Sequence, residues 1–274
     1  MTKSLNGTEL VGYIKERQAR QVRGLRQARN VFPRLVIVKT PGASKVIETY
    51  VRLKQAYGTD ILIQTDAETA TEAEMPALIE RLNHDDSVHG IIVQLPLDDP
   101  SKTDEILGLI APEKDVDGLG EQARFDSATA IAINWLLAGY GIALENKKIA
   151  IVGNGRLVGA PLARMWKRSG FNVQVLDRST DDITKEIRQS DVIVTATGVP
   201  RLITSMMLNI GAVVVDAGTA SENGTIVGDL DESIRERDDL IITPEKGGVG
   251  PLTVAALFDN VIAAALARAG SGEA

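Results

Sequence analysis

Short apolar runs alternate with segments that carry an apolar residue every three or four positions. The short runs predict buried strands, and the longer periodic segments predict amphipathic helices. Strands are expected at 35–38, 61–63, 90–93, 148–152, 172–176, 191–196, 212–216 and 239–242. Helices are expected at 7–29, over the segment with Tyr50 and Tyr57, and at 71–82, 128–137, 160–168, 181–188, 204–208 and 253–267.

This alternation predicts an α/β fold with mostly parallel sheets in two lobes. A polar, turn-rich segment at 112–118 interrupts it, and the helix at 128–137 is expected to join the lobes. We therefore expect an N-terminal α/β domain over 1–125 and a Rossmann-type dinucleotide-binding domain over 126–252. The apolar C-terminal helix, 253–274, is long enough to pack back on the first lobe and complete it.

The segment Ile151–Pro161 has three glycines, Gly153, Gly155 and Gly159, between a predicted strand and a predicted helix. Glycines let a backbone approach a pyrophosphate, and a helix N-terminus supplies free N–H groups and partial positive charge. Taken alone, the three glycines would serve an ordinary strand-to-helix turn equally well. Neighbouring residues must decide between these interpretations.

Asp177 ends the strand at 172–176, 24 positions after Gly153. An acid there can accept hydrogen bonds from a ribose 2′-hydroxyl and repels a 2′-phosphate. The adjacent Arg178 would instead attract a 2′-phosphate, so NAD and NADP both remain open. The segments 196–200 and 216–219 end the next strands, at the sheet edge where dinucleotides bind in such folds.

Four residues of the first lobe are candidates for chemistry. Tyr50 and Lys54 stand four apart on a predicted helix and share a face, where burial would lower the pKa of the lysine. Gln94 ends an apolar strand, at a point that opens into a cleft in α/β proteins. Asp117 precedes Gly118 in a turn and would serve as a cap equally well.

Composition excludes several classes of function. The 274 residues carry a net charge of −7, which disfavours a broad nucleic-acid site. The chain has no cysteine, hence no disulfide, thiolate nucleophile or cysteine-bound zinc. His84 and His89 lack partners at metal-ligand spacing, so no metal site is expected. The start lacks a signal-peptide core, and we expect no apolar run of about 18 residues, no membrane association and a cytoplasmic location.

Several motifs occur together in one order, and they carry a resemblance to a known family. They are TYVRLK (Thr49–Lys54), HGIIVQLPLD (His89–Asp98), PEKDVDG (Pro112–Gly118), IVGNGRLVGAP (Ile151–Pro161), VVVDAGT (Val213–Thr219) and GGVGPLTVAAL (Gly247–Leu257). Over essentially its whole length the chain resembles the bifunctional methylenetetrahydrofolate dehydrogenase/methenyltetrahydrofolate cyclohydrolase family.

The resemblance implies an enzyme that oxidises 5,10-methylenetetrahydrofolate and hydrolyses the methenyl product to 10-formyltetrahydrofolate. It makes Lys54 the key catalytic residue, which activates water, and Gln94 the residue that polarises or positions the reacting centre. Tyr50 would stack along the folate and Asp117 would hydrogen-bond the pterin ring. The N-terminal domain would then bind the folate.

The resemblance also implies a nicotinamide cofactor, normally NADP, and a homodimer that pairs through the second lobe. The cofactor-binding residues would be Gly153, Asn154, Gly155, Asp177, Arg178 and Thr219, with Thr219 near the nicotinamide ring. Further substrate-binding residues would be Gly247, Gly248 and Pro251.

The chain departs from the family pattern on the cofactor side. Asn154-Gly155 stand where the family has Arg-Ser, and Asp177 stands where it has histidine. Both changes weaken the case for NADP and favour NAD, while Arg178 remains a partner for a 2′-phosphate.

Other segments differ as well. Residues 127–130 replace Pro-Cys-Thr-Pro, Glu245-Lys246 replace an apolar pair, and Ala43-Ser44 lie too far before Tyr50 to match the family's Ala-Ser. Two alternatives therefore stay open: an NAD-preferring monofunctional dehydrogenase, and a folate- or nucleotide-binding protein without dehydrogenase turnover. A shikimate-type dehydrogenase would explain the second lobe only.

Overall fold

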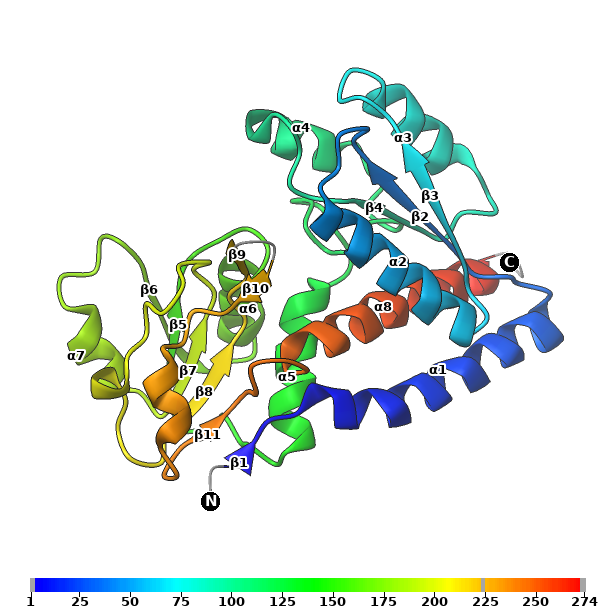
Figure 1. Ribbon diagram of the computed structural model, residues 1–274. Coiled ribbons are helices and arrows are strands. Elements are labelled where there is room, and N and C mark those ends of the chain that lie inside the picture. Colours follow the sequence, from blue (N-terminus) through cyan, green and yellow to red (C-terminus); the bar gives the residue numbers. More distant parts are fainter. Residues whose placement is uncertain (1–2, 223–224, 272–274) are drawn as a thin grey trace. The chain divides into compact units, whose positions relative to one another are not determined.

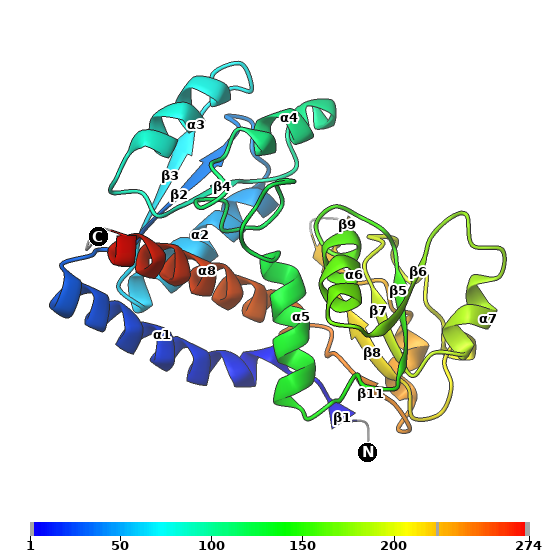
Figure 2. The same cartoon turned by 180° about the vertical axis from the view of Figure 1, so that it is seen from behind.

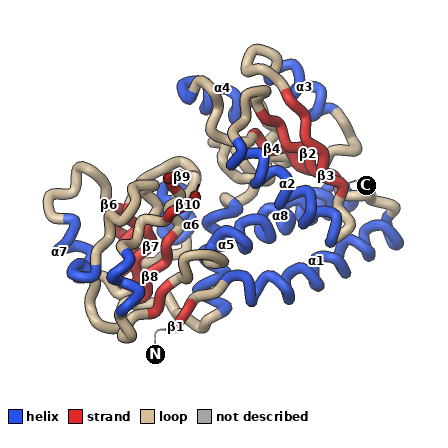
Figure 3. The backbone as a smooth tube through the Cα atoms, viewed as in Figure 1, coloured by secondary structure: helices blue, strands red, loops and turns tan. Residues whose placement is uncertain are grey.

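The computed structural model describes residues 3–222 and 225–271, which form two compact units (Figure 1). The Lys54 unit comprises Gly12–Ala128 and the chain from Val254 onward. The glycine-loop unit comprises the chain up to Val11 and Thr129–Thr253. Both contain parallel strands with helices around them (Figure 3), which confirms the predicted α/β class.

The first residues belong to the glycine-loop unit, whereas the sequence-based boundaries placed 1–125 in one N-terminal domain. The reason is strand β1 (Lys3–Ser4), which pairs in parallel with β11 (Ile241–Ile242). A two-residue strand has too little pattern to be predicted from sequence. Residues 272–274 of the expected C-terminal helix lie outside the described residues.

The Lys54 unit contains a three-stranded parallel sheet in the order β3-β2-β4. Its strands are β2 (Arg34–Lys39), β3 (Gln64–Thr69) and β4 (Gly90–Val93). Its helical elements are most of α1 (Gly7–Arg29), α2 (Lys45–Asp60), α3 (Met75–His84), η1 (Pro100–Lys102), α4 (Thr103–Gly108) and most of α8 (Val249–Ser271). Every residue of β4 is buried, as expected of a strand in a covered parallel sheet.

The predicted strand at 61–63 is wrong. Ile61 is the C-cap of α2, Leu62 has a positive φ of 67°, and the strand is the following polar segment, Gln64–Thr69. Ile61 and Ile63 are buried and fill the core beside the turn. Because β3 is an edge strand, its side chains are partly solvated and its sequence need not be apolar.

The helix predicted at 71–82 begins only at Met75. Before it, Glu74 accepts hydrogen bonds from the backbone N–H and the hydroxyl of Thr71, at 2.9 and 2.7 Å. These bonds satisfy both donors of Thr71 ahead of the helix. Glu72 is partly buried rather than outward-facing, and it accepts the Asp99 N–H at 2.7 Å.

Helix α8 packs on α1 and α2 within the Lys54 unit, which confirms the predicted return of the C-terminal helix. Tyr57 stacks on Phe258 with ring centroids 5.2 Å apart. The Tyr57 hydroxyl donates to Gln18 Oε1 at 2.8 Å, and Gln18 Nε2 donates to the Ala255 carbonyl at 2.8 Å. Asn260 reaches the Val116 carbonyl at 2.9 Å and so ties α8 to the loop that carries Asp117.

The expectation that no apolar run could span a bilayer is also wrong. Within the described residues one helix, Val249–Gly270, is long and apolar enough. In its most apolar window 61% is buried inside the protein, as in the core helix of a soluble protein. A membrane-spanning helix and a buried core helix can share the same length and composition.

The glycine-loop unit contains a six-stranded parallel sheet in the order β1-β11-β8-β7-β5-β6. The remaining strands are β5 (Lys148–Val152), β6 (Asn172–Leu176), β7 (Val192–Thr195) and β8 (Val213–Asp216). The helices are α5 (Ala128–Gly139), α6 (Gly159–Arg168), α7 (Ile183–Arg188), η2 (Ser205–Met207) and η3 (Glu232–Glu236). Strands β9 (Ala220–Glu222) and β10 (Thr225–Val227) form an antiparallel pair.

The strand order identifies where a ligand would bind to this sheet. Strand β5 lies between β6 and β7, and the chain order reverses there. Helix α6 packs on β5 and β6, as Figure 2 shows from behind. Doubly wound sheets bind ligands outside the carboxyl ends of their strands at such a reversal. The loops after β5 and β7 therefore flank the expected site.

Candidate active site and dinucleotide loop

Lys54 and Gln94 are in direct contact in the Lys54 unit. Lys54 Nζ donates a hydrogen bond to Gln94 Oε1 at 2.6 Å, which joins α2 to the segment after β4. Burial lowers the pKa of Lys54, while the negative charge of Asp117 raises it. Burial thus favours the neutral amine, the form that can accept a proton.

Helix α2 holds Lys54 in place through its cap and its buried face. The Ser44 hydroxyl accepts the N–H of Ile47 at 3.3 Å, an N-cap that begins the helix. Ile47 and Val51 are buried against the unit's core. Tyr50 lies one turn before Lys54 and is partly buried, which raises the pKa of its phenol.

Gln94 continues the sheet hydrogen bonding of β4. Its backbone N–H donates to the Val38 carbonyl at 2.8 Å, and its Nε2 donates to the Leu95 carbonyl at 3.3 Å. The next peptide bond, Leu95–Pro96, is cis. The side chain thus lies at the carboxyl edge of the sheet, with one oxygen facing the lysine.

Asp117 is the partly buried acid of this site. Burial raises its pKa to about 6, the Lys54 charge lowers it, and the Asp115 charge raises it further. The carboxyl can therefore change its protonation state near neutral pH. Lys54 thus donates a hydrogen bond to Gln94 and interacts with the charge of Asp117. Tyr50 lies on the same helix as Lys54.

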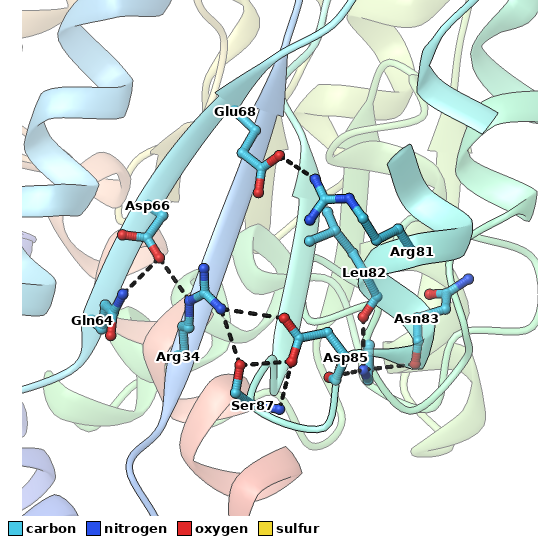
Figure 4. A network of polar contacts seen from close by, with 10 residues as sticks. Arg34, Gln64, Asp66, Glu68, Arg81, Leu82, Asn83, Asp85 and Ser87 are labelled. Atoms are coloured by element: carbon cyan, nitrogen blue, oxygen red, sulfur yellow. Dashed lines mark hydrogen bonds and ion pairs between the residues drawn. The ribbon is translucent and has the colours of Figure 1, made fainter. Parts of the chain in front are cut away.

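The loop with Asp117 is fixed by two residues that the sequence reasoning did not assign a role. Lys114 is buried, and its Nζ donates to the carbonyls of Leu82, Asn83 and Asp85, each at 2.8 Å (Figure 4). Asp115 accepts the N–H groups of Gly118 and Gly120 at 3.0 and 2.7 Å. The PEKDVDG motif was the available signal for both.

A polar network at the amino end of the same sheet shares Asp85 with the Lys114 contacts (Figure 4). Arg34 Nε donates to Asp66 Oδ2 at 2.7 Å. Arg34 Nη1 donates to Asp85 Oδ2 at 3.4 Å and to Ser87 Oγ at 3.0 Å. This network ties β2 to β3 and to the turn before β4. It lies at the opposite end of the strands from Gln94.

The glycine loop after β5 has the tight geometry that a pyrophosphate cradle needs. Gly153 has a φ of +101°, a region that disfavours other residues. A Cβ on Gly159 would lie 1.9 Å from the Gly153 carbonyl oxygen, so only glycine lets α6 begin so close to the loop. Asn154 and Gly155 are exposed beside this helix start. The loop fits a dinucleotide phosphate group.

Asp177 lies beside this loop, because the Gly153 N–H donates to the Leu176 carbonyl at 2.8 Å. Its carboxylate accepts the N–H and the hydroxyl of Ser179, at 2.9 and 2.6 Å, and these bonds lower its pKa. Asp177 is therefore ionised at neutral pH. Arg178 is exposed next to it.

The other predicted residues of this unit surround the carboxyl edge or begin α8. Thr219 is exposed, and its carbonyl oxygen lies 3.4 Å from where a Cβ on Gly198 would be. Gly247 has a φ of +83° and accepts the Thr8 N–H at 3.0 Å. Gly247, Gly248 and Pro251 belong to the glycine-loop unit, and Lys54 belongs to the other.

The divergent segments are ordered parts of the fold. Ser127 and Ala128 are buried where α5 begins, whereas Glu245 and Lys246 are exposed just before Gly247.

Comparison with known proteins decides the family. Residues 5–117 match the catalytic domain, and residues 127–269 the NAD(P)-binding domain, of tetrahydrofolate dehydrogenase/cyclohydrolase. The chain belongs to the tetrahydrofolate dehydrogenase/cyclohydrolase family. The bifunctional protein FolD of Campylobacter jejuni is 37% identical over 96% of this chain and 98% of its own length.

Solved structures of the family agree with the fold. The bifunctional FolD dehydrogenase/cyclohydrolase of Campylobacter jejuni superposes with a TM-score of 0.90 at 36% identity, over 98% of this chain and 100% of that one. The Trypanosoma brucei enzyme, complexed with NADP cofactor and an inhibitor, gives a TM-score of 0.88 at 28% identity, over 99% and 98%. The shared architecture spans both units.

Proposed function

We propose that this protein oxidises 5,10-methylenetetrahydrofolate to 5,10-methenyltetrahydrofolate with a nicotinamide cofactor and hydrolyses the product to 10-formyltetrahydrofolate. The observation that carries the proposal is the 2.6 Å contact of Lys54 with Gln94, in the field of the partly buried Asp117. Family membership and the glycine loop supply the dehydrogenase half of the proposal.

In the hydrolytic step Lys54 acts as the base. Its neutral amine takes a proton from the water that attacks the methenyl carbon. In the resulting carbinol the bond from that carbon to N5 breaks, and N5 takes up the proton held by the Lys54 ammonium. The carbinol hydroxyl loses its proton to solvent as the C=O bond forms, so the formyl group stays on N10 and one proton is released. Gln94 orients the amine through its Oε1 and positions the reacting carbon. When it is ionised, Asp117 accepts hydrogen bonds from the pterin ring, and Tyr50 stacks on the folate.

In the oxidation, the protein contributes placement rather than proton transfer. The bound nicotinamide cofactor supplies the acceptor for the hydride of the methylene carbon. Gly153, Asn154 and Gly155 would hold the phosphates of this cofactor, and Thr219 would serve its nicotinamide half. We also assign Gly247, Gly248 and Pro251 to folate binding, as the family resemblance implies.

NADP is the proposed cofactor. An NADP complex of the Trypanosoma brucei relative and the exposed Arg178 support it. NAD is the second candidate, because the ionised Asp177 lies beside the glycine loop and repels a 2′-phosphate. Comparison of kcat/KM for the two cofactors decides between them.

We also propose a cytoplasmic homodimer that pairs through the glycine-loop unit, on the basis of the family resemblance. Sedimentation equilibrium of the full chain tests the dimer, and a monomer at micromolar concentration would contradict it.

The hydrolytic half is tested without any nucleotide. Purified protein should accelerate the loss of methenyltetrahydrofolate absorbance over the buffer rate, with 10-formyltetrahydrofolate as the product. The altered segments 127–130 and 245–246 suggest a second candidate function, a binding protein without turnover. Such a protein would bind folate but would leave methenyltetrahydrofolate loss and 10-formyltetrahydrofolate formation at the buffer rate.

A further inference from the structure

Two aspartates lie beneath the loops at the carboxyl edge of the six-stranded sheet. Asp216 ends β8 and accepts hydrogen bonds at Oδ1 from the N–H groups of Gly218 and Asp229, at 3.0 and 3.1 Å. Thr195, its neighbour on β7, also donates to Oδ1 at 3.2 Å. Asp229 is completely buried.

The Asp229 carboxyl group packs on Gly218, and the Asp216 carboxyl group packs on Gly228. A Cβ on Gly218 would lie 2.1 Å from Asp229 Oδ1, and a Cβ on Gly228 would lie 2.0 Å from Asp216 Oδ2. Any side chain at either glycine would displace a carboxyl group. The segments 216–218 and 228–229 therefore fit together only with glycine at both positions.

The Asp229 carboxyl group also makes a hydrogen bond to a residue outside this pair. Its Oδ2 accepts the backbone N–H of Thr197 at 2.7 Å. Its Oδ1 is buried and has no hydrogen-bond partner among residues 3–222 and 225–271. A buried carboxylate oxygen without a partner costs free energy.

Thr197 occupies a specific place in the unit. It follows β7 at the reversal of strand order, and its Cγ2 lies 3.2 Å from where a Cβ on Gly153 would be. The turn continues through Gly198, which has a φ of +65° and lies next to the Thr219 carbonyl. The 196–199 turn thus bridges the glycine loop and the 216–219 segment.

We infer that Asp229 is a positioning residue for dinucleotide binding. It holds the 196–199 turn through the Thr197 N–H, and it fixes the 216–219 segment through Gly218. A dinucleotide bound across the strand-order reversal would place its nicotinamide half against these two segments and its adenosine half against Asp177 and the end of β6. The inference rests on the proposed dehydrogenase function.

The test compares Asp229→Ala with Asp229→Asn in the full chain. Asparagine keeps an oxygen that accepts the Thr197 N–H, and alanine does not. Calorimetry would measure the affinity for NADP, or for NAD if the wild type prefers it, and for ADP, which lacks the nicotinamide half. We expect alanine to weaken dinucleotide binding about tenfold, the effect of one lost hydrogen bond, and to leave ADP binding unchanged. Asparagine should bind both ligands as the wild type does.

Equal losses for ADP and the dinucleotide in Asp229→Ala would show a purely structural role and overturn the inference. Unchanged dinucleotide affinity would overturn it as well. Asp231→Ala is the matched control, because Asp231 caps η3 in the same segment by accepting the Ser233 N–H at 3.0 Å. If the alanine variant does not fold, Asp229→Ser, whose shorter side chain does not reach Thr197, is judged by the same criteria.

Failure of the proposed function would look different. In that case the wild type itself would bind neither dinucleotide or would not oxidise methylenetetrahydrofolate. Hydrolysis of methenyltetrahydrofolate needs no nucleotide, so its rate in each variant reports on the Lys54 unit independently.

Discussion

Lys54 Nζ and Gln94 Oε1 are 2.6 Å apart, although 40 residues separate them in the chain. The contact joins a capped helix, α2, to the carboxyl end of the buried strand β4. The hydrogen bond fixes the position of the Lys54 amine, and burial favours the neutral form of that amine.

Lys54→Met should abolish most of the hydrolysis of methenyltetrahydrofolate. General bases contribute about 100-fold or more to such rates, so we expect a loss of at least that size. The matched control is Lys45→Met, which removes an exposed lysine from the same helix and should leave the rate unchanged. Circular dichroism would verify folding, and an unchanged hydrolysis rate in a folded Lys54→Met protein would refute the assignment of the base.

Folate utilisation should depend on pH through Asp117. The Asp117 carboxyl has a pKa raised to about 6 by burial, so it is ionised above that pH and protonated below it. A protonated carboxyl accepts hydrogen bonds less well, hence kcat/KM for the folate should fall as the pH drops through about 6. In Asp117→Asn the value should be low throughout and lack this inflection. Persistence of the same inflection in the variant would assign it to another group.

The cofactor preference should respond to the charge of Asp177. Asp177→Asn removes the charge that opposes a 2′-phosphate, so the ratio of kcat/KM for NADP over NAD should rise several-fold. Arg178→Ala should lower the same ratio. Asp181→Asn, the same change of charge at an exposed position in the same loop, serves as the control. If the Asp177 and Asp181 variants shift the ratio equally, general surface charge rather than position is responsible.

Gly159→Ala should displace α6 from the glycine loop, since its Cβ would lie 1.9 Å from the Gly153 carbonyl oxygen. We expect a loss of about 1–3 kcal/mol in the free energy of unfolding and a higher KM for the cofactor. Gly24→Ala provides the comparison, because a Cβ there meets nothing within 4 Å and alanine favours helix. Denaturant unfolding measures both, and equal stability of the two variants would contradict the packing argument.

Lys114→Met should destabilise the loop that carries Asp117. Three carbonyl acceptors lose their shared charged donor, and we expect a cost of about 3 kcal/mol or more in unfolding free energy. Lys102→Met removes a half-exposed lysine whose Nζ lies 3.7 Å from Glu72, and should cost less than about 1 kcal/mol. Urea unfolding measures both changes. A Lys114 variant as stable as the Lys102 variant would show that the carbonyl contacts contribute little.

Sequence patterns predicted the elements that bury continuous apolar runs. Strands such as β5 and helix α6 follow from their composition and flanking glycines. The patterns failed for β3, because an edge strand is partly solvated and the apolar residues before it fill a turn. They also missed β1, whose two residues become a strand only through pairing with β11, some 240 positions away in the chain.

In the candidate site, too, the sequence predicted the residues, whereas their contacts depend on tertiary packing. Motifs singled out Lys54, Gln94 and Asp117, but not their contacts, since a hydrogen bond between α2 and β4 depends on tertiary packing. Lys114 and Asp115 stood inside a quoted motif, yet their role is visible only from the carbonyls and N–H groups around them. Asp229 gave no sequence signal, because its partner Thr197 lies 32 positions earlier.

The most direct test of the central claim is one assay of the wild-type protein with 5,10-methylenetetrahydrofolate and either NADP or NAD. We predict a cofactor-dependent rise in methenyl absorbance, followed by its conversion to 10-formyltetrahydrofolate faster than in buffer. Absence of methenyl formation with both cofactors, together with hydrolysis at the buffer rate, would contradict the account.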